Sequence, residues 1–203
     1  MAYPFLLVLS NSADGGVLAD QLRARGWDVE LSGDKLGPEK AAKPSQLIVS
    51  YGYRHIVDRA TIAAVSGEIV NLHISLLPWN RGADPNIWSF LEDTPKGVTI
   101  HRLTPGLDRG PIFAQRRVEF DEAEETLASS YEKLQNVMRE VFLDNVSAIA
   151  QGRIAPWPQE EGGSSHRSAE LASYRDALLG DERFDIPIPT LRRRWRDFSA
   201  AAR

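Results

Sequence analysis

The stretch Asn71-Leu-His-Ile-Ser-Leu-Leu-Pro78 joins a strand-like pattern to a turn that ends at a proline. Asn71 and His73 are two residues apart, so on a β-strand both side chains point to the same side of the sheet. Pro78 favours a turn directly after that strand. The stretch therefore predicts that an amide and an imidazole stand together where a buried strand ends.

A carboxylate follows further along the chain. The apolar run Val98 to Leu103 predicts another strand, and Asp108 comes after it in the turn-forming segment Gly106-Leu-Asp-Arg-Gly110. Transfer of an acyl group to an amine needs a donor for the carbonyl oxygen, a base for the amine proton and a carboxylate that orients or charge-balances the base. Asn71, His73 and Asp108 supply these three groups, so we expect them to be catalytic.

Short apolar runs alternate with segments of helical periodicity along the first 150 residues. The predicted strands are Phe5–Leu9, Trp27–Leu31, Gln46–Ser50, Glu68–Ile74, Val98–Leu103 and Ile112–Val118, and the predicted helices are Val17–Arg25, Asp58–Val65, Pro85–Leu91 and Thr126–Ile149. Such alternation predicts an α/β fold with a mainly parallel sheet covered on both faces. Ligands of such folds bind beyond the carboxyl ends of the strands, where the three polar groups fall.

The composition changes after Ile149. A connector rich in proline and glycine begins at Gln151, and we expect residues 151–203 to form this connector and a small C-terminal appendage after a main domain of residues 1–150. Ala169–Leu179 has helical character, Phe184–Ile188 is expected to be extended, and a basic helix follows it. The cluster Arg192–Arg194 with Arg196 is interpreted as a solvated helix face, and the alternative is a contact with a phosphate or a partner.

Composition excludes several classes of function. The net charge of -4 argues against a nucleic-acid partner, which calls for a basic surface. The chain has no cysteine, so neither a disulfide nor a thiol nucleophile is expected, and a cytoplasmic location suits it. The first residues do not resemble a signal peptide, and no apolar run approaches the roughly 20 residues that span a bilayer. We therefore expect small-molecule partners and no membrane association.

The ordered motifs resemble those of the folate-dependent formyltransferases. The motifs are Asn71 to Pro78, Arg81-Gly82, Gly97-Val-Thr-Ile-His101 and Asp108-Arg-Gly110. The resemblance is close from about Ser50 to Ile112, looser from Phe5 to Val49, and fades after about Gly152. It implies a Rossmann-like catalytic domain in residues 1–150 and the co-substrate 10-formyltetrahydrofolate, with Asn71, His73 and Asp108 as the catalytic trio.

The resemblance also implies binding residues. Ser75, Leu76, Leu77 and Pro78 match the turn that contacts the folate, and the loop that starts with Tyr51 and Gly52 is expected to border the same pocket. No metal site is expected. Arg81 is interpreted as an exposed residue at the acceptor entrance that binds a phosphate, because a guanidinium pairs with phosphate in a two-pronged geometry.

The remaining histidines and two tryptophans allow less specific interpretations. His101 lies in a predicted strand and is expected to be structural or to line the pocket, and His55 is assigned to the architecture of the cofactor pocket. His166 is expected on the surface. Trp79 and Trp88 could stack on a ligand, although the helical position of Trp88 favours packing.

The acceptor amine is less well defined. Ser10-Asn-Ser-Ala-Asp-Gly-Gly16 stands where ribonucleotide-specific members carry a phosphate-binding glycine-rich loop, and residues 151–203 are too few for the barrel domain of the tRNA enzymes. Most similar are the sugar N-formyltransferases, which implies a nucleotide-linked amino sugar of the 4-amino-4,6-dideoxyhexose type. Alternatives are another small amine or methionyl-tRNA as acceptor, a formyltetrahydrofolate hydrolase, and a non-catalytic module that senses folate or nucleotide.

The C-terminal appendage carries several apolar side chains. They are Phe184, Ile186, Ile188, Leu191 and Trp195. Apolar tails on small domains often pack against a second copy, so we predict a homodimer. The alternative is that the tail folds back onto its own domain.

Overall fold

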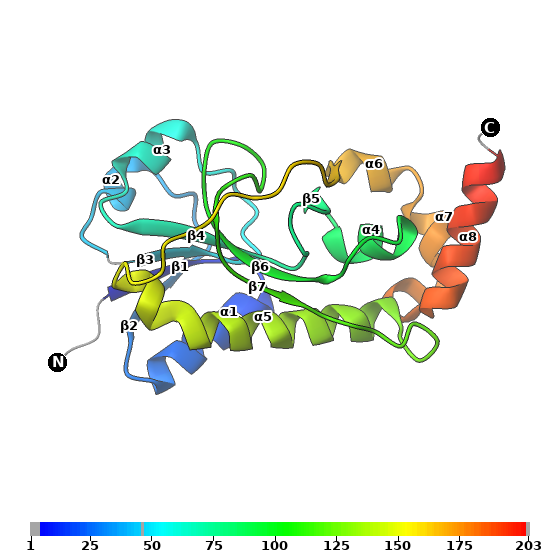
Figure 1. Cartoon of the computed structure of the whole chain (residues 1–203), viewed down its shortest axis with the longest axis horizontal. Coiled ribbons are helices and arrows are strands. Elements are labelled where there is room, and N and C mark those ends of the chain that lie inside the picture. The colour runs from blue at the N-terminus through cyan, green and yellow to red at the C-terminus, as the bar shows by residue number, and fades with distance from the viewer. Residues whose placement is uncertain (1–4, 46, 202–203) are drawn as a thin grey trace. The chain divides into compact units, whose positions relative to one another are not determined.

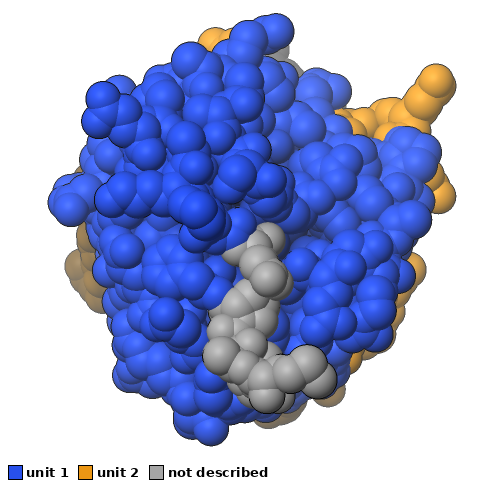
Figure 2. Space-filling model, turned by 90° about the vertical axis from the view of Figure 1, so that its left-hand side faces the viewer, with its two compact units in different colours: residues 1–73, 99–115, 138–159 blue, residues 74–98, 116–137, 160–203 orange. Residues whose placement is uncertain are grey.

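The computed structural model describes residues 5–45 and 47–201, and these form two compact units. Unit 1 contains residues 1–73, 99–115 and 138–159, and unit 2 contains residues 74–98, 116–137 and 160–203 (Figure 2). Each unit is thus assembled from segments that lie far apart in the sequence. The functional division into residues 1–150 and 151–203 stays a prediction.

A six-stranded sheet runs through the fold in the order β2-β1-β3-β4-β6-β7 (Figure 1). The strands are β1 (Phe5–Leu9), β2 (Asp28–Ser32), β3 (Leu47–Ser50), β4 (Glu68–His73), β6 (Gly97–Arg102) and β7 (Ile112–Arg117). Strands β1 to β4 pair in parallel, whereas β6 runs antiparallel to β4. The predicted α/β class with a mainly parallel sheet is confirmed, and the strand bounds agree to within a residue; Gln46 lies outside the described residues.

Helices of unit 1 cover both sides of the sheet. Helix α1 (Ala13–Ala24) and the later part of α5 (Leu127–Ala150) lie on one side, and α2 (Pro38–Ala41) and α3 (Arg59–Ala64) on the other (Figure 1). The central strands β1 and β3 are largely apolar because both of their faces are buried, whereas the edge strands β2 and β7 also carry exposed polar residues. On the α2 and α3 side, the core consists of Leu7, Leu9, Leu36, Ala41, Ile48, Val57 and Ile69.

Side-chain caps set the starts of two helices in unit 1. The Ser12 hydroxyl accepts a hydrogen bond from the backbone N–H of Gly15, so α1 begins at Ala13 and not at the predicted Val17. The Asp58 carboxylate accepts from the backbone N–H of Thr61 in the same way, which holds the pKa of Asp58 below its usual range. The apolar periodicity of α1 starts later than the helix, which is why periodicity alone misplaced its start.

Unit 2 gathers shorter elements around its own core. They are β5 (Arg81–Gly82), α4 (Pro85–Leu91), β8 (Ser165–His166), α6 (Ser168–Ala172), α7 (Arg175–Leu179), the 3₁₀ helix η1 (Gly180–Asp185) and α8 (Ile188–Ala201). The core consists of Ile87, Trp88, Phe90, Leu91, Leu127, Leu171, Leu178, Leu179, Ile186, Ile188 and Leu191. Much of the C-terminal tail is therefore packed inside unit 2.

Two predictions for the tail differ from the structure. The helix expected over Ala169–Leu179 is interrupted between α6 and α7, and each part buries its own leucines in the core of unit 2. The extended segment expected over Phe184–Ile188 is wrong at both ends, because Phe184 and Asp185 belong to η1 and Ile188 begins α8. Only the short piece around Pro187 pairs as a strand does, through a bridge to Thr126.

Gly110 offers a test of this architecture. A Cβ atom at Gly110 would lie 1.7 Å from the backbone oxygen of Arg102, so Gly110→Ala must displace the backbone next to the Asp108 turn. We expect a lower melting temperature and reduced activity. Gly16→Ala is the matched control, because a Cβ there meets nothing within 4 Å; it should leave stability unchanged or raise it slightly. Equal melting temperatures for Gly110→Ala and the wild type would contradict the packing.

Candidate active site

Strand β4 presents Asn71 and His73 at its carboxyl end. Its antiparallel partner β6 places His101 directly opposite Asn71 and Thr99 opposite His73. Residues that face each other on neighbouring strands share one face of the sheet, so His101 joins Asn71 and His73 on one side. The sheet register thus collects an amide and two imidazoles.

The third predicted group, Asp108, lies in the turn between β6 and β7. Its φ of 49° is left-handed, a conformation that aspartate tolerates better than most residues. The side-chain amide of Gln159 donates to the backbone oxygens of Asp108, at 2.7 Å, and of Gly110, at 2.9 Å. Gln159 therefore holds the second half of the turn, and the carboxylate projects from a constrained backbone.

The structure brings the predicted trio together within unit 1. The Asn71 side-chain nitrogen donates to Asp108 Oδ1 at 3.2 Å, and His73 Nδ1 lies 3.7 Å from Asp108 Oδ2. The side chains of His73 and Asp108 are 8% and 11% exposed, so water reaches them only at the margin. Charges in such a setting interact more strongly than on the open surface. The group can orient an imidazole and offer N–H donors to a bound carbonyl.

His101 is the residue whose importance the sequence did not indicate. Its Nε2 lies 3.3 Å from the Asn71 amide nitrogen and 3.3 Å from Asp108 Oδ1. Its Nδ1 lies 2.9 Å from the backbone oxygen of Arg102, and since a carbonyl only accepts, Nδ1 carries a proton. His101, which was expected to be structural or to line the pocket, thus contacts two members of the trio directly. The antiparallel register that creates these contacts is not visible in the sequence.

An ion pair between Arg102 and Glu68 lies next to this cluster in the sheet. Arg102 Nε donates to Glu68 at 2.9 Å, and this hydrogen bond raises the pKa of Arg102 above its usual value. The pair joins the start of β4 to the end of β6, where Val70 and Arg102 are in register. The Arg102 side chain is therefore engaged in a contact between two strands of the sheet.

The turn predicted to contact folate belongs to unit 2. Ser75 and Leu77 are buried, Leu76 is partly exposed and next to Gly97, and the Ser75 hydroxyl donates to the backbone oxygen of Trp79. Pro78 packs closely against Gly163, where a Cβ would come within 1.9 Å of the Pro78 oxygen. The connector at Gly163, expected to be a plain loop, thus supports this turn.

Tyr51 and Gly52 follow β3 in unit 1. Tyr51 is buried, and its backbone N–H donates to Leu9. Gly52 has a φ of 58°, and a Cβ there would lie 2.5 Å from the Ser12 hydroxyl, so glycine is required at this position. The assignment of Tyr51, Gly52 and the Ser75 to Pro78 turn to folate binding stays a prediction.

Two expectations about exposure are wrong. Arg81 is only 6% exposed, and its guanidinium donates to the backbone oxygen of Gly162 at 3.0 Å, because strand β5 pairs with β8 and covers it. His166 is 5% exposed; it stacks on Trp88 with ring centroids 4.0 Å apart and lies between Glu92 and Glu170. Trp88 is therefore a packing residue. The phosphate-binding role of Arg81 stays a prediction.

Two other kinds of site would need a metal-binding cluster or a membrane-spanning helix. Within residues 5–45 and 47–201, no cluster of histidine, aspartate and glutamate is arranged to hold a metal ion. In the same residues, no helix combines the length and the apolar character that a membrane crossing requires.

Known proteins resemble this chain in sequence and in fold. The formyl transferase family profile matches residues 20–146. The formyltransferase PseJ from Anoxybacillus kamchatkensis, solved with UDP-4,6-dideoxy-4-formamido-L-AltNAc and tetrahydrofolate, is 40% identical and superposes with a TM-score of 0.83 over 92% of this chain and 97% of its own.

Two curated relatives have different acceptors in their names. A dTDP-4-amino-4,6-dideoxyglucose formyltransferase of Mycobacterium tuberculosis is 30% identical over 77% of this chain and 72% of its own length. A methionyl-tRNA formyltransferase of Pelobacter propionicus is 32% identical over 68% of this chain, but over only 43% of its own length.

The chain belongs to the formyl transferase family. The resemblance inferred from the motifs is thereby confirmed, as is the Rossmann-like fold. The protein is an enzyme that transfers a formyl group, and the cluster around Asp108 is its candidate active site.

Substitution of the trio tests that assignment. His73→Ala and Asp108→Ala should each lower turnover by roughly 100-fold or more, the usual scale for removal of a positioned acid–base group. Circular dichroism should report an intact fold. Arg153→Ala, which removes an exposed side chain that pairs only locally with Gln151, serves as the control and should keep full turnover. A His73→Ala enzyme with near-normal turnover would rule out the assigned role.

Proposed function

We propose that this enzyme is an N-formyltransferase that moves a formyl group from 10-formyltetrahydrofolate to the amine of a nucleotide-linked amino sugar. The observation that carries the proposal is the contact of one carboxylate, Asp108, with the Asn71 amide at 3.2 Å and the His73 imidazole at 3.7 Å. An N–H donor, a titratable imidazole and a carboxylate are the groups that formyl transfer to an amine requires.

Asn71 and His73 have the electrostatic role in the proposed mechanism. 10-Formyltetrahydrofolate supplies the formyl carbon that the neutral acceptor amine attacks. The Asn71 side-chain N–H and protonated His73 donate to the formyl oxygen, where negative charge develops. Donors that are already oriented stabilise such charge without a reorganisation cost. The low exposure of His73 strengthens its interaction with that oxygen.

In the proposed mechanism, Asp108 receives the proton that the acceptor amine loses. Its carboxylate holds the His73 ring and, directly or through a water molecule, takes up the proton that leaves the attacking nitrogen. As the bond between the amine nitrogen and the formyl carbon forms, the bond between that carbon and N10 of the folate breaks. N10 takes up a proton in exchange for the one that the amine loses, so the products are a formamide and tetrahydrofolate.

We infer that His101 is a positioning residue for this step. With the proton on Nδ1, its Nε2 accepts from one Asn71 N–H while Asp108 accepts from the other. His101 and Asp108 thereby orient the Asn71 amide, and the formyl oxygen takes over one of its two N–H donors during transfer.

His101→Leu separates positioning from substrate binding. We expect kcat to fall about tenfold or more, at the lower end of the scale for acid–base groups, with the KM of both substrates nearly unchanged. An unchanged kcat would assign His101 to packing alone.

The proposed acceptor class rests on the relatives. PseJ, which covers nearly the whole chain, was solved with a UDP-linked formamido sugar, and the Mycobacterium tuberculosis enzyme is named for a dTDP-linked amino sugar. The methionyl-tRNA relative is matched over less than half of its length, and the net charge of -4 suits a small-molecule acceptor better than tRNA.

The oligomeric state and the cellular location of the enzyme are further proposals. Ile186, Ile188 and Leu191 are fully buried inside unit 2, so the tail folds back with these residues, as the alternative interpretation had it. Among the tail residues expected to make the dimer contact, Phe184 remains 52% exposed. A homodimer in the cytoplasm is kept as a proposal, which light scattering at micromolar concentration and fractionation of cells test.

The proposed reaction is tested with 10-formyltetrahydrofolate and four sets of acceptors. We expect tetrahydrofolate to form only when a UDP- or dTDP-linked 4-amino-4,6-dideoxyhexose is present, with a formamide as the second product by mass spectrometry. Methionyl-tRNA, a free amino sugar, and no acceptor complete the series.

Each other result assigns a different function. Turnover without any amine would indicate a hydrolase, turnover with methionyl-tRNA would indicate the tRNA enzyme, and folate binding without turnover would indicate a sensing module. Any of these would contradict the proposed acceptor.

A further inference from the structure

A glutamine outside the catalytic trio is bonded to the backbone of the Asp108 turn. The side-chain nitrogen of Gln159 donates to the backbone oxygen of Asp108 at 2.7 Å and to that of Gly110 at 2.9 Å. A carboxamide nitrogen carries two N–H groups, so each of the two carbonyl groups receives its own donor. Gln159 belongs to unit 1, as the turn does, and lies beyond residue 146, where the match to the formyl transferase profile ends.

The connector after α5 brings Gln159 to the turn. Helix α5 ends at Ala150, and Gly152, whose φ of 64° is left-handed, follows it. Trp157 then exchanges two backbone hydrogen bonds with Ile112, at 2.7 and 2.9 Å, as residues of antiparallel strands do. The next such pair in an antiparallel ladder would join residues 159 and 110. The Gln159 side chain therefore bonds the Gly110 oxygen where the ladder would continue.

The turn is also fixed at its junctions with β6 and β7. The backbone N–H of Arg102 donates to Pro111 at 2.8 Å, and a Cβ atom at Gly110 would lie 1.7 Å from the Arg102 oxygen. Between these points the chain passes through Asp108, whose peptide oxygen is the one that Gln159 holds. A peptide group cannot rotate without breaking the hydrogen bond to its oxygen. Gln159 therefore fixes the orientation of the peptide group that follows Asp108.

The direction of the Asp108 carboxylate depends on this backbone. The carboxylate lies 3.2 Å from the Asn71 amide nitrogen, 3.7 Å from His73 Nδ1 and 3.3 Å from His101 Nε2. Misplacement of a catalytic group by about 1 Å lowers the rate by roughly 100-fold. A rotation of the peptide group that follows Asp108 would move the carboxylate relative to all three side chains.

We propose that Gln159 is a positioning residue for formyl transfer. It holds the turn so that the Asp108 carboxylate meets the His73 ring and the proton of the attacking amine. Both of its N–H groups are used by the turn, so its donors act on the reacting atoms only through Asp108. This inference rests on the proposed function, which gives Asp108 that role.

A purely structural role of Gln159 leads to a different expectation. If Gln159 only stabilised the loop, its replacement would lower activity by the same factor whether or not the Asp108 carboxylate is present. If Gln159 positions that carboxylate, the replacement lowers activity only while the carboxylate is there. Residues that act through one another show such non-additive effects, and independent residues do not.

Gln159→Met is the first test, because methionine keeps the length of the side chain and removes both donors. We expect kcat to fall at least tenfold, with the KM of the folate and of the acceptor nearly unchanged and the fold intact by circular dichroism. Gln151→Met is the matched control. It makes the same change at an exposed position of the same connector, where the Gln151 side chain accepts from Arg153. It should keep the wild-type kcat.

Gln159→Glu is the second variant, and it serves also if Gln159→Met does not fold. Glutamate has the shape of glutamine, but its carboxylate only accepts and can bond neither carbonyl oxygen. Its kcat should therefore fall at least as far as that of Gln159→Met. A wild-type kcat in the folded variants would overturn the proposal. A loss that appears in KM alone would overturn it too and would assign Gln159 to substrate binding.

A double-mutant cycle with Asp108→Ala separates positioning from loop stability. In the Asp108→Ala background, Gln159→Met should leave the remaining kcat unchanged, because no carboxylate is left to position. A further tenfold loss in that background would refute the positioning role and would assign Gln159 to the stability of the loop.

The inference and the proposed function fail in different ways. If Asp108→Ala keeps near-normal turnover, the proposed role of Asp108 fails, and the role of Gln159 fails with it. If Asp108→Ala is slow while Gln159→Met is as fast as the wild type, the inference about Gln159 alone fails. The cycle is measured with whichever amine the wild type formylates, so the identity of the acceptor does not affect its outcome.

Discussion

The antiparallel pairing of β4 with β6 is the constraint on which the candidate site depends. It sets Asn71 opposite His101 and ends β6 beside Val70, and the loop that follows β6 carries Asp108 back to Asn71 and His73. The Asp108 carboxylate then contacts an amide and two imidazoles that come from two strands. A slip of one residue in this register would turn every side chain of β6 to the other face and dissolve the cluster.

Much of the fold follows from local pattern. Runs such as Phe5–Leu9 and Pro85–Leu91 were predicted with the observed bounds, because an apolar run and a helix opened by proline leave few alternatives. The trio was predicted from the order of its motifs together with the resemblance to the family. The side of the sheet that His101 occupies could not be predicted, since strand direction is a property of the whole sheet and not of one segment.

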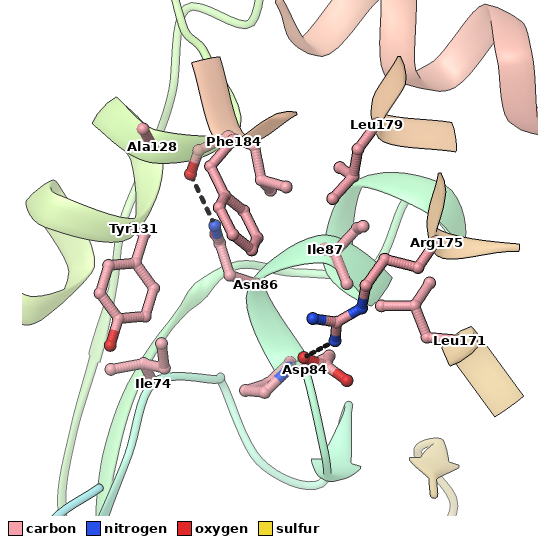
Figure 3. A pocket seen from close by; sticks show the side chains of 12 residues that line it. Ile74, Asp84, Asn86, Ile87, Ala128, Tyr131, Leu171, Arg175, Leu179 and Phe184 are labelled. Atoms are coloured by element: carbon pink, nitrogen blue, oxygen red, sulfur yellow. Dashed lines mark hydrogen bonds and ion pairs between the residues drawn. The ribbon is translucent and has the colours of Figure 1, made fainter. Parts of the chain in front are cut away.

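The wrong predictions of exposure concern residues whose burial depends on segments that are distant in the sequence. Arg81 was expected to be exposed at the acceptor entrance after the predicted folate turn, and His166 was expected on the surface. In the structure, β5 pairs with β8 over 80 residues away in the chain, and Ser165 and His166 cover what would be an open turn. The same long-range assembly builds an apolar pocket of about 470 Å³ in unit 2, whose walls come from three separate sections, within residues 74–87, 127–131 and 171–184 (Figure 3). Neither the burial of Arg81 and His166 nor the pocket of unit 2 could be deduced from the periodicity of the sequence.

The central claim is that Asn71, His73 and Asp108 surround the formyl group during transfer. A crystal structure of the enzyme with tetrahydrofolate and the formamido product of a nucleotide-linked amino sugar tests it most directly. We expect the formyl oxygen within hydrogen-bond distance, about 3 Å, of the Asn71 amide nitrogen and of a His73 ring nitrogen, with Asp108 beside the formamide nitrogen. A formamide bound away from all three residues would contradict the account.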